Sequence, residues 1–217
     1  MTTMLDRQHA LVVVDVQRDF LPGGALAVPH GDEVVPVINR LMPRFELVVA
    51  TQDWHPPDHV SFAANHPGRE PFESIELDGA PQTLWPTHCV QESTGADFAP
   101  GLKVEHFARV FRKGVDPRCD SYSGFFDNRH AHDTGLAGYL REHGVKTVHV
   151  CGLATDYCVR FTALDALDEG FDVVLIADAC RGVDLNPGDI DNTLAELKRR
   201  GVAIRQSERY VTGEIAS

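Results

Sequence analysis

The stretch GLATDYCVR, residues 152–160, places a thiol where an expected strand passes into an expected helix. Thr155 and Asp156 are residue types that favour a helix N-cap, and the apolar run after them predicts a buried helix with Cys158 in its first turn. A helix N-terminus stabilises a thiolate, and its free N–H groups can bind an oxyanion. Cys158 is therefore a candidate nucleophile. The alternative is a small buried side chain without chemistry, which is the interpretation given to Cys151 inside the preceding strand.

A second group of residues has the types and spacing of metal ligands. In the segment DWHPPDH, Asp53 and His55 point the same way if the chain is extended, and two prolines turn the chain so that His59 can swing back towards them. His88, in the segment WPTHC, adds another imidazole. One carboxylate and three imidazoles suit a divalent ion such as zinc, iron or manganese. Histidines in loops are often plain surface residues, but the spacing and the prolines favour a metal site.

Two more candidates stand at the ends of expected strands. Asp15 follows the first apolar run, and Lys113 ends the third. In open α/β sheets, sites form beyond the carboxyl ends of the strands, which would bring these side chains towards Cys158 and Asp53. Taken alone, Asp15 fits a turn or a helix cap equally well, and Arg112 could as easily be the useful basic residue.

The elements that must position these side chains alternate along the chain. Apolar runs typical of strands covered on both faces occupy residues 10–16, 46–51, 107–113, 146–152 and 172–178, with a weaker sixth at 202–207. Helical patterns occupy residues 31–42, 134–143, 155–169 and 188–200. This order predicts a three-layer, Rossmann-like α/β fold, with a mostly parallel six-stranded sheet, helices on both faces and a single domain over residues 1–217. Residues 52–106 and 114–133 break the pattern, and loops of that length are commonly functional.

Composition narrows the possible partners. The 217 residues are 43% hydrophobic and 24% charged, as in ordinary folded domains, and the formal net charge of -12 disfavours nucleic acid as a partner. No apolar run is long enough to cross a bilayer, and the N-terminal segment lacks a signal-peptide cleavage site, so no membrane partner is expected. Five cysteines without paired spacing argue against a disulfide framework and for the reducing cytoplasm.

Five segments of the chain together resemble the bacterial nicotinamidase/pyrazinamidase branch of the isochorismatase-like cysteine hydrolases. The resemblance covers nearly the whole chain, and the segments come in the order typical of that family. They are VVVDVQRDFLPGGALAV, ATQDWHPPDHVSFAANHPG, LWPTHCVQESTGADFAPGL, FRKGVDPRCDSYSGFFDN and GLATDYCVRFTALDAL.

The resemblance implies a role for each matching residue. The catalytic triad of the family falls on Asp15, Lys113 and Cys158. The ligands of its single metal ion fall on Asp53, His55, His59 and His88. The oxyanion hole falls on the backbone N–H groups of Ala154 and Cys158, next to a cis peptide bond that corresponds to Leu153–Ala154. The substrate-binding positions fall on Phe20, Trp85, Leu153 and, as a looser match, Tyr122.

The resemblance further implies an amidase that converts nicotinamide to nicotinate and ammonia in NAD salvage, and that also accepts pyrazinamide. Asp15 would take the thiol proton as Cys158 attacks the amide carbon, Lys113 would favour the thiolate, and the metal would orient the pyridine ring. Three alternatives stay open: a metal-hydroxide-dependent amidohydrolase with a structural Cys158, another isochorismatase-like amide hydrolase, and a non-enzymatic metal or redox sensor. The sequence is compatible with a homo-oligomer but leaves the number of subunits open.

Overall fold

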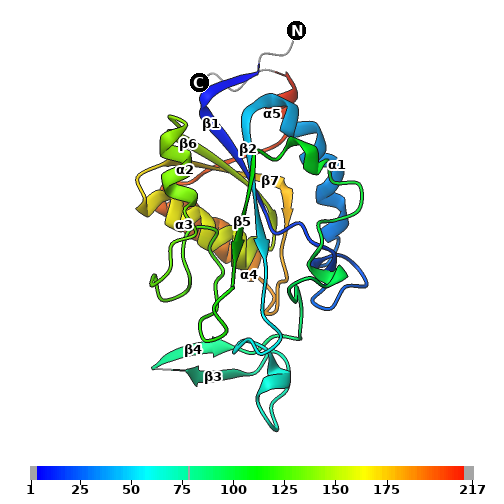
Figure 1. The fold of residues 1–217 in the computed structure, drawn as a ribbon. Helices are drawn as coiled ribbons and strands as arrows, with labels where there is room; N and C mark the ends of the chain where they lie inside the picture. Colours follow the sequence, from blue (N-terminus) through cyan, green and yellow to red (C-terminus); the bar gives the residue numbers. More distant parts are fainter. Residues whose placement is uncertain (1–3, 78, 213–217) are drawn as a thin grey trace.

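A parallel sheet forms the centre of the protein in the computed structural model, which describes residues 4–77 and 79–212 (Figure 1). The strands are hydrogen-bonded in the order β5-β2-β1-β6-β7-β8, and each neighbouring pair is parallel. Their bounds are β1 (Leu5–Val14), β2 (Phe45–Asp53), β5 (Arg109–Lys113), β6 (Thr147–Leu153), β7 (Asp172–Arg181) and β8 (Ala203–Arg205). The predicted six-stranded sheet is confirmed. The expectation of one domain includes residues 1–3, 78 and 213–217, which lie outside the described residues.

Helices cover both faces of the sheet, as predicted. In Figure 1, α1 and α5 lie on one side of the sheet, and α2, α3 and α4 lie on the other. The bounds are α1 (Val34–Leu41), α2 (Leu136–Glu142), α3 (Arg160–Asp168), α4 (Asp189–Arg200) and α5 (Glu208–Thr212). Because both faces are covered, the β-branched run Val12, Val13 and Val14 of β1 is 0% exposed. Within the described residues, none of the helices combines the length and the apolar character needed to span a bilayer.

The strand order reverses direction between β1 and β6. From β1 the chain continues to β2 on one side, whereas β6 is followed by β7 and β8 on the other side. Binding sites of open α/β sheets form at such a switch point, beyond the carboxyl ends of the strands. Asp15 comes directly after β1, and Cys158 comes shortly after β6, so these two residues flank the switch point.

A short hairpin and a short helix lie in segments where the sequence predicted no regular element. Within residues 52–106, β3 (Ser74–Leu77) and β4 (Ala80–Thr83) form an antiparallel hairpin, which Figure 1 shows beyond the carboxyl ends of the central strands. Gly79, at φ +84°, supplies the left-handed turn residue of this hairpin. The other element is α5, whose five residues are too few for a helical hydrophobic period to be recognised.

The helix expected over residues 155–169 begins differently from the prediction. Its first turn, Thr155–Val159, is a wide π turn that continues into α3, and its N-cap is Ala154 without a side-chain capping bond. The Asp156 carboxylate instead accepts hydrogen bonds from the backbone of Val183 and Asp184, at 2.9 and 2.7 Å. The prediction that Thr155 and Asp156 cap this helix is therefore wrong, because the Asp156 side chain holds the loop after β7 instead.

Candidate active site

Three side chains from separate elements meet beyond the carboxyl edge of the sheet. Asp15 follows β1, Lys113 ends β5, and Cys158 lies in the π turn after β6. Lys113 Nζ lies 2.9 Å from Asp15 Oδ2 and 3.4 Å from Cys158 Sγ. All three residues are buried. The structure thus brings together the three residues that the sequence analysis assigned to a triad.

Burial and charge determine the protonation of these groups. Burial raises the pKa of the Cys158 thiol well above its usual range, and the nearby Lys113 offsets only part of that shift. Burial also raises the pKa of Asp15. Burial by itself lowers the pKa of Lys113. The negative charges of Asp15 and Asp53 outweigh this effect and raise the pKa well above its usual range, so the ammonium group stays charged. A thiol whose pKa is raised in this way needs a base at the moment of attack.

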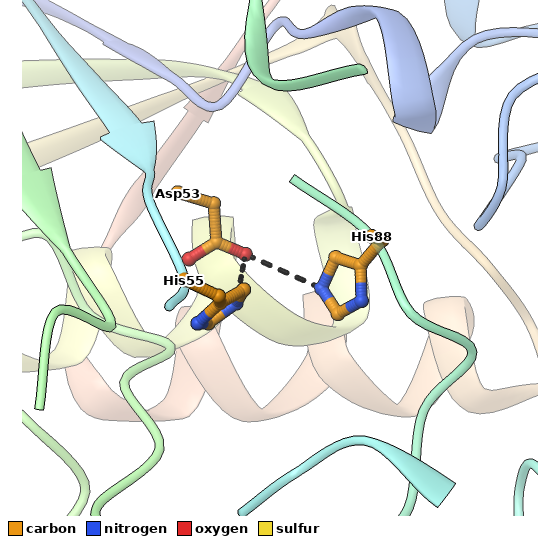
Figure 2. Close-up of side chains that lie close together, drawn as sticks. All are labelled: Asp53, His55 and His88. Atoms are coloured by element: carbon orange, nitrogen blue, oxygen red, sulfur yellow. Dashed lines mark hydrogen bonds and ion pairs between the residues drawn. The ribbon is translucent and has the colours of Figure 1, made fainter. Parts of the chain in front are cut away.

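Asp53, the last residue of β2, connects this triad to a cluster of histidines. Its Oδ1 accepts a hydrogen bond from Lys113 Nζ at 2.8 Å. Its Oδ2 lies 3.0 Å from His55 Nε2 and 3.5 Å from His88 Nε2. Figure 2 shows both imidazole rings facing this one carboxylate oxygen. One carboxylate therefore serves two sets of partners.

The spacing of Asp53, His55 and His88 fits a metal centre. His55 Nδ1 lies 3.0 Å from the Gly114 carbonyl and His88 Nδ1 lies 2.7 Å from the Pro86 carbonyl, so both Nδ1 atoms act as donors and both Nε2 atoms present lone pairs. Three electron-pair donors that face one another suit a cation bound between them. Ligand atoms about 2.1 Å from one ion are about 3.0 Å apart at right angles and about 3.4 Å apart at the tetrahedral angle. The two separations from Asp53, 3.0 and 3.5 Å, lie close to these two values.

His59 lies beside His55 but outside that group of three. The two ring centroids are 4.2 Å apart, and His59 Nδ1 is 2.7 Å from Ser61 Oγ. Burial, together with the neighbouring His55, lowers the pKa of His59 to about 4. Its ligand atom belongs to a second group, with His55 and Asp120, in which all three atoms lie within 4.8 Å of one another. The four expected ligands are therefore neighbours, but they do not surround one point.

A cavity with aromatic walls leads from the surface to the thiol. Phe20, Trp85 and Tyr122 line it, as the sequence analysis expected, and Trp85 Nε1 donates a hydrogen bond to Tyr122 Oη at 3.1 Å. Asp53, His88, Ala154 and Cys158 are also among its lining residues. The cavity therefore reaches from two of the candidate metal ligands to the candidate nucleophile.

Leu153 and Ala154 differ in how they meet this cavity. The peptide bond between them is cis, as the family resemblance implied. Ala154 lines the cavity, whereas the side chain of Leu153 is 0% exposed and packs in the core. Of this pair, therefore, only Ala154 borders the cavity.

Sequence reasoning missed several residues that complete the site. Tyr157 and Asp120 line the cavity, and Thr51 Oγ1 donates to Asp15 Oδ1 at 2.7 Å. Thr51 precedes Asp53 by two positions in β2, and this spacing, which puts two side chains on one face of a strand, could have identified it. Gly114 was also given no role from the sequence. Its φ is +66°, and a Cβ at this position would lie 2.4 Å from His55 Cε1, so a side chain here would collide with that ring.

Comparisons with known proteins agree with this architecture. The chain is 51% identical over 200 residues to a nicotinamidase of Escherichia coli (strain K12), a match that covers 90% of this chain and 93% of that protein. An Acinetobacter baumannii nicotinamidase/pyrazinamidase structure superposes with a TM-score of 0.91 and 51% identity, over 94% of this chain and 98% of that one. A Pyrococcus horikoshii pyrazinamidase solved in complex with zinc superposes with a TM-score of 0.76 and 43% identity, over 92% and 99% of the two chains.

The family assignment rests on most of the chain. The model of the isochorismatase domain matches residues 9–209, which include every residue of the triad, the histidine cluster and the aromatic cavity. The chain therefore belongs to the isochorismatase family.

Proposed function

We infer that the protein is an amidase that hydrolyses nicotinamide to nicotinate and ammonia and that also accepts pyrazinamide. The observation that carries this conclusion is one aromatic cavity that reaches both Cys158 and the ligand-type side chains Asp53 and His88. A pyridine carboxamide has the matching parts: a flat ring, a ring nitrogen and an amide carbon. The nicotinamidases among the similar proteins support the same substrate.

In the first half of the reaction, Cys158 Sγ attacks the amide carbon and Asp15 takes the thiol proton. The oxyanion that forms would be stabilised by the backbone N–H groups of Ala154 and Cys158 at the start of the helix. Asp15 then passes its proton to the departing nitrogen. The C–N bond breaks, ammonia leaves, and a thioester joins the nicotinoyl group to Cys158.

In the second half, water attacks the thioester and Asp15 again serves as the base. The C–S bond breaks, the proton held by Asp15 returns to the sulfur, and nicotinate leaves as the carboxylate while the second proton of the water passes to solvent. Lys113 stays protonated throughout, since two carboxylates surround it. Its charge stabilises the thiolate leaving group and keeps Asp15 in place.

The pyridine ring would lie between the aromatic walls, with its nitrogen directed towards the histidine cluster. Asp53, His55 and His88 would hold a divalent ion, with His59 beside them. Zinc, iron and manganese suit this donor set, and a bound ion would supply a Lewis acid for the ring nitrogen.

The remaining proposals concern the setting of the enzyme. A thiol nucleophile among five free cysteines suits a reducing compartment, so we propose the cytoplasm as the location. We also propose that the nicotinate produced is used in NAD salvage. We also propose that residues 1–217 act as one domain, because the sheet takes strands from both ends of the sequence. The partner is a small molecule, and the number of subunits stays open.

Ammonia release from nicotinamide by the purified protein tests the proposed function. Cys158→Ala should abolish release, and the matched control Cys151→Ala, which truncates a buried thiol inside β6, should retain it. A slow substrate should leave a thioester adduct on Cys158, visible as a mass increase of the peptide that contains it. Full activity of Cys158→Ala would favour a metal-hydroxide mechanism, and no release by the wild-type protein would favour a sensor.

A further inference from the structure

A second group of ligand-type side chains adjoins the proposed metal centre. His55, His59 and Asp120 each offer one ligand atom, and these atoms lie within 4.8 Å of one another. All three residues are buried, and His55 also belongs to the group with Asp53 and His88. His59 is therefore associated with a carboxylate of its own, in a loop that the ligand motifs of the sequence do not include.

Asp120 is a buried carboxylate that two neutral groups hold in place. It is 4% exposed. Its Oδ1 accepts a hydrogen bond from the Ser121 backbone N–H and its Oδ2 accepts one from Gln82 Nε2 in β4, both at 2.8 Å. Each oxygen of a carboxylate has two lone pairs, so both keep acceptor capacity after these bonds. These contacts fix the direction of the side chain without using up its ability to bind a cation or a water molecule.

The position of Asp120 is at the boundary of two cavities. It lines the aromatic cavity together with Asp53 and Cys158, and it also lines a second cavity of about 260 Å³ together with Tyr122 and Phe161. The carboxylate thus borders the substrate space on the side of His59. A charge in this position acts on whatever occupies the histidine cluster.

The charge balance of the cluster calls for a second carboxylate. Asp53 already shares its charge with Lys113, whose Nζ lies 2.8 Å from Oδ1. The histidines are neutral when they act as ligands. A divalent ion held by these groups alone would keep an excess of positive charge in a buried site, where uncompensated charge is costly. Asp120 can supply the missing negative charge.

We propose that Asp120 is a fifth residue of the metal centre and acts on the ion from the side of His59. This inference rests on the metal centre of the proposed function. Asp120 either binds the ion directly or accepts a hydrogen bond from a water molecule on it, and in both cases its charge raises the affinity of the centre. Partners of this kind change metal affinity by about 10- to 100-fold.

Metal affinity measured apart from activity tests the proposal. Wild-type protein and Asp120→Asn are stripped with a chelator and titrated with Zn²⁺ in competition with a chromogenic chelator. Asp120→Asn should bind Zn²⁺ about 10- to 100-fold more weakly. The visible absorption spectrum of the Co²⁺-loaded protein should change as well. Asp120→Glu, which keeps the charge, should bind more tightly than Asp120→Asn.

The control is Asp58→Asn, because Asp58 precedes His59 and is exposed to solvent. It should leave both the affinity and the Co²⁺ spectrum unchanged. Wild-type affinity and an unaltered spectrum in a folded Asp120→Asn protein would overturn the proposal. So would a wild-type protein that binds neither Zn²⁺ nor Co²⁺.

A crystal of the Zn²⁺-loaded wild-type protein decides the question if the variants do not fold. An anomalous peak within bonding distance of an Asp120 oxygen shows direct binding, and a shared water molecule shows the indirect mode. An ion with neither contact overturns the proposal. Ammonia release by the wild-type protein is scored separately, so loss of the Asp120 role and loss of the amidase function give different results.

Discussion

Asp15 has a backbone conformation that few side chains adopt. Its φ is 47°, in the left-handed region, which aspartate tolerates better than most residues. The Thr51 hydroxyl donates to Oδ1 and fixes the carboxylate. Among the described residues, Oδ2 has no well-aligned hydrogen bond, although it forms an ion pair with Lys113 at 2.9 Å. In the proposed reaction, Oδ2 is therefore the oxygen that would receive the thiol proton.

Asp15→Asn retains the shape of this side chain and removes the base. We expect kcat for nicotinamide to fall by about 100- to 10,000-fold, which is the usual contribution of a general base. Nicotinamide should still bind, as equilibrium dialysis would show. Asp172→Asn, an exposed residue at the start of β7, is the control and should keep full activity. Normal turnover by Asp15→Asn would contradict its role as the base.

Thr51 acts through Asp15 and is a positioning residue. Thr51→Val removes the hydrogen bond to Oδ1, and we expect kcat to fall by about 10- to 100-fold while KM changes little, since a hydrogen bond to a charged group contributes about 1.5–3 kcal/mol. The same bond lowers the pKa of Asp15, so its loss should move the acidic limb of the pH–rate profile to higher pH. Thr51→Ser should restore both values. An unchanged profile would mean that Thr51 only supports the fold.

At the scale of elements, the regular strands and helices were predictable, and the loops that complete the site were not. The central strands have continuous apolar runs because both faces are covered. The β3–β4 hairpin has strands of four residues with partly exposed side chains, so no clear period marks it. Asp120 and Gln82 meet only because that hairpin packs against the loop after β5. Local spacing carries no signal for such a contact.

Removing the metal tests the loop that follows β2. Chelation should raise KM for nicotinamide, because the ring nitrogen loses its partner, and added zinc should restore it. Benzamide lacks that nitrogen, so it should be a poor substrate whose rate changes little on chelation. Kinetics of both amides before chelation, after chelation and after zinc addition provide the test. Equal turnover of the two amides, or an equal loss on chelation, would show that the ion has a role other than orientation.

At the scale of the whole molecule, the sheet order explains why residues far apart in sequence could be assigned to one site. Parallel strands end at one edge, so side chains placed at strand ends in the sequence converge there. The ligand motif was recognisable because Asp53 and His55 lie within one segment. The separation of His59 from Asp53 and His88 depends on the path of the loop, which no local pattern reveals.

The opposite end of the sheet contains a buried histidine that makes folding sensitive to acid. His149 in β6 is 2% exposed, and its ring nitrogens lie 2.6 Å from Tyr210 Oη of α5 and 3.0 Å from His9 Nδ1 of β1. Burial, with a smaller contribution from His9, lowers the pKa of His149 from its usual 6.5 to about 3. The folded protein therefore holds His149 neutral where the unfolded chain would protonate it.

This difference predicts how the free energy of unfolding depends on pH. Between about pH 6.5 and about pH 3, the unfolded state binds one more proton at His149, so stability should fall by up to about 1.4 kcal/mol for each unit that the pH decreases. His149→Gln should lose this part of the acid sensitivity, as urea unfolding at pH 7 and pH 4.5 would show. His143→Gln, at the exposed end of α2, is the control. Equal pH dependence in all three proteins would contradict the prediction.

The pairing of β1 with β6 also determines when the site can come into existence. His9 lies opposite Thr147, so β1 can pair with β6 only after the ribosome has synthesised about 130 further residues. Asp15 and Lys113 are both synthesised before Cys158. Contacts between segments so distant in sequence form slowly, because closing a long loop has an entropic cost. A nascent chain therefore cannot bring Asp15, Lys113 and Cys158 together until β6 has been synthesised and has paired with β1.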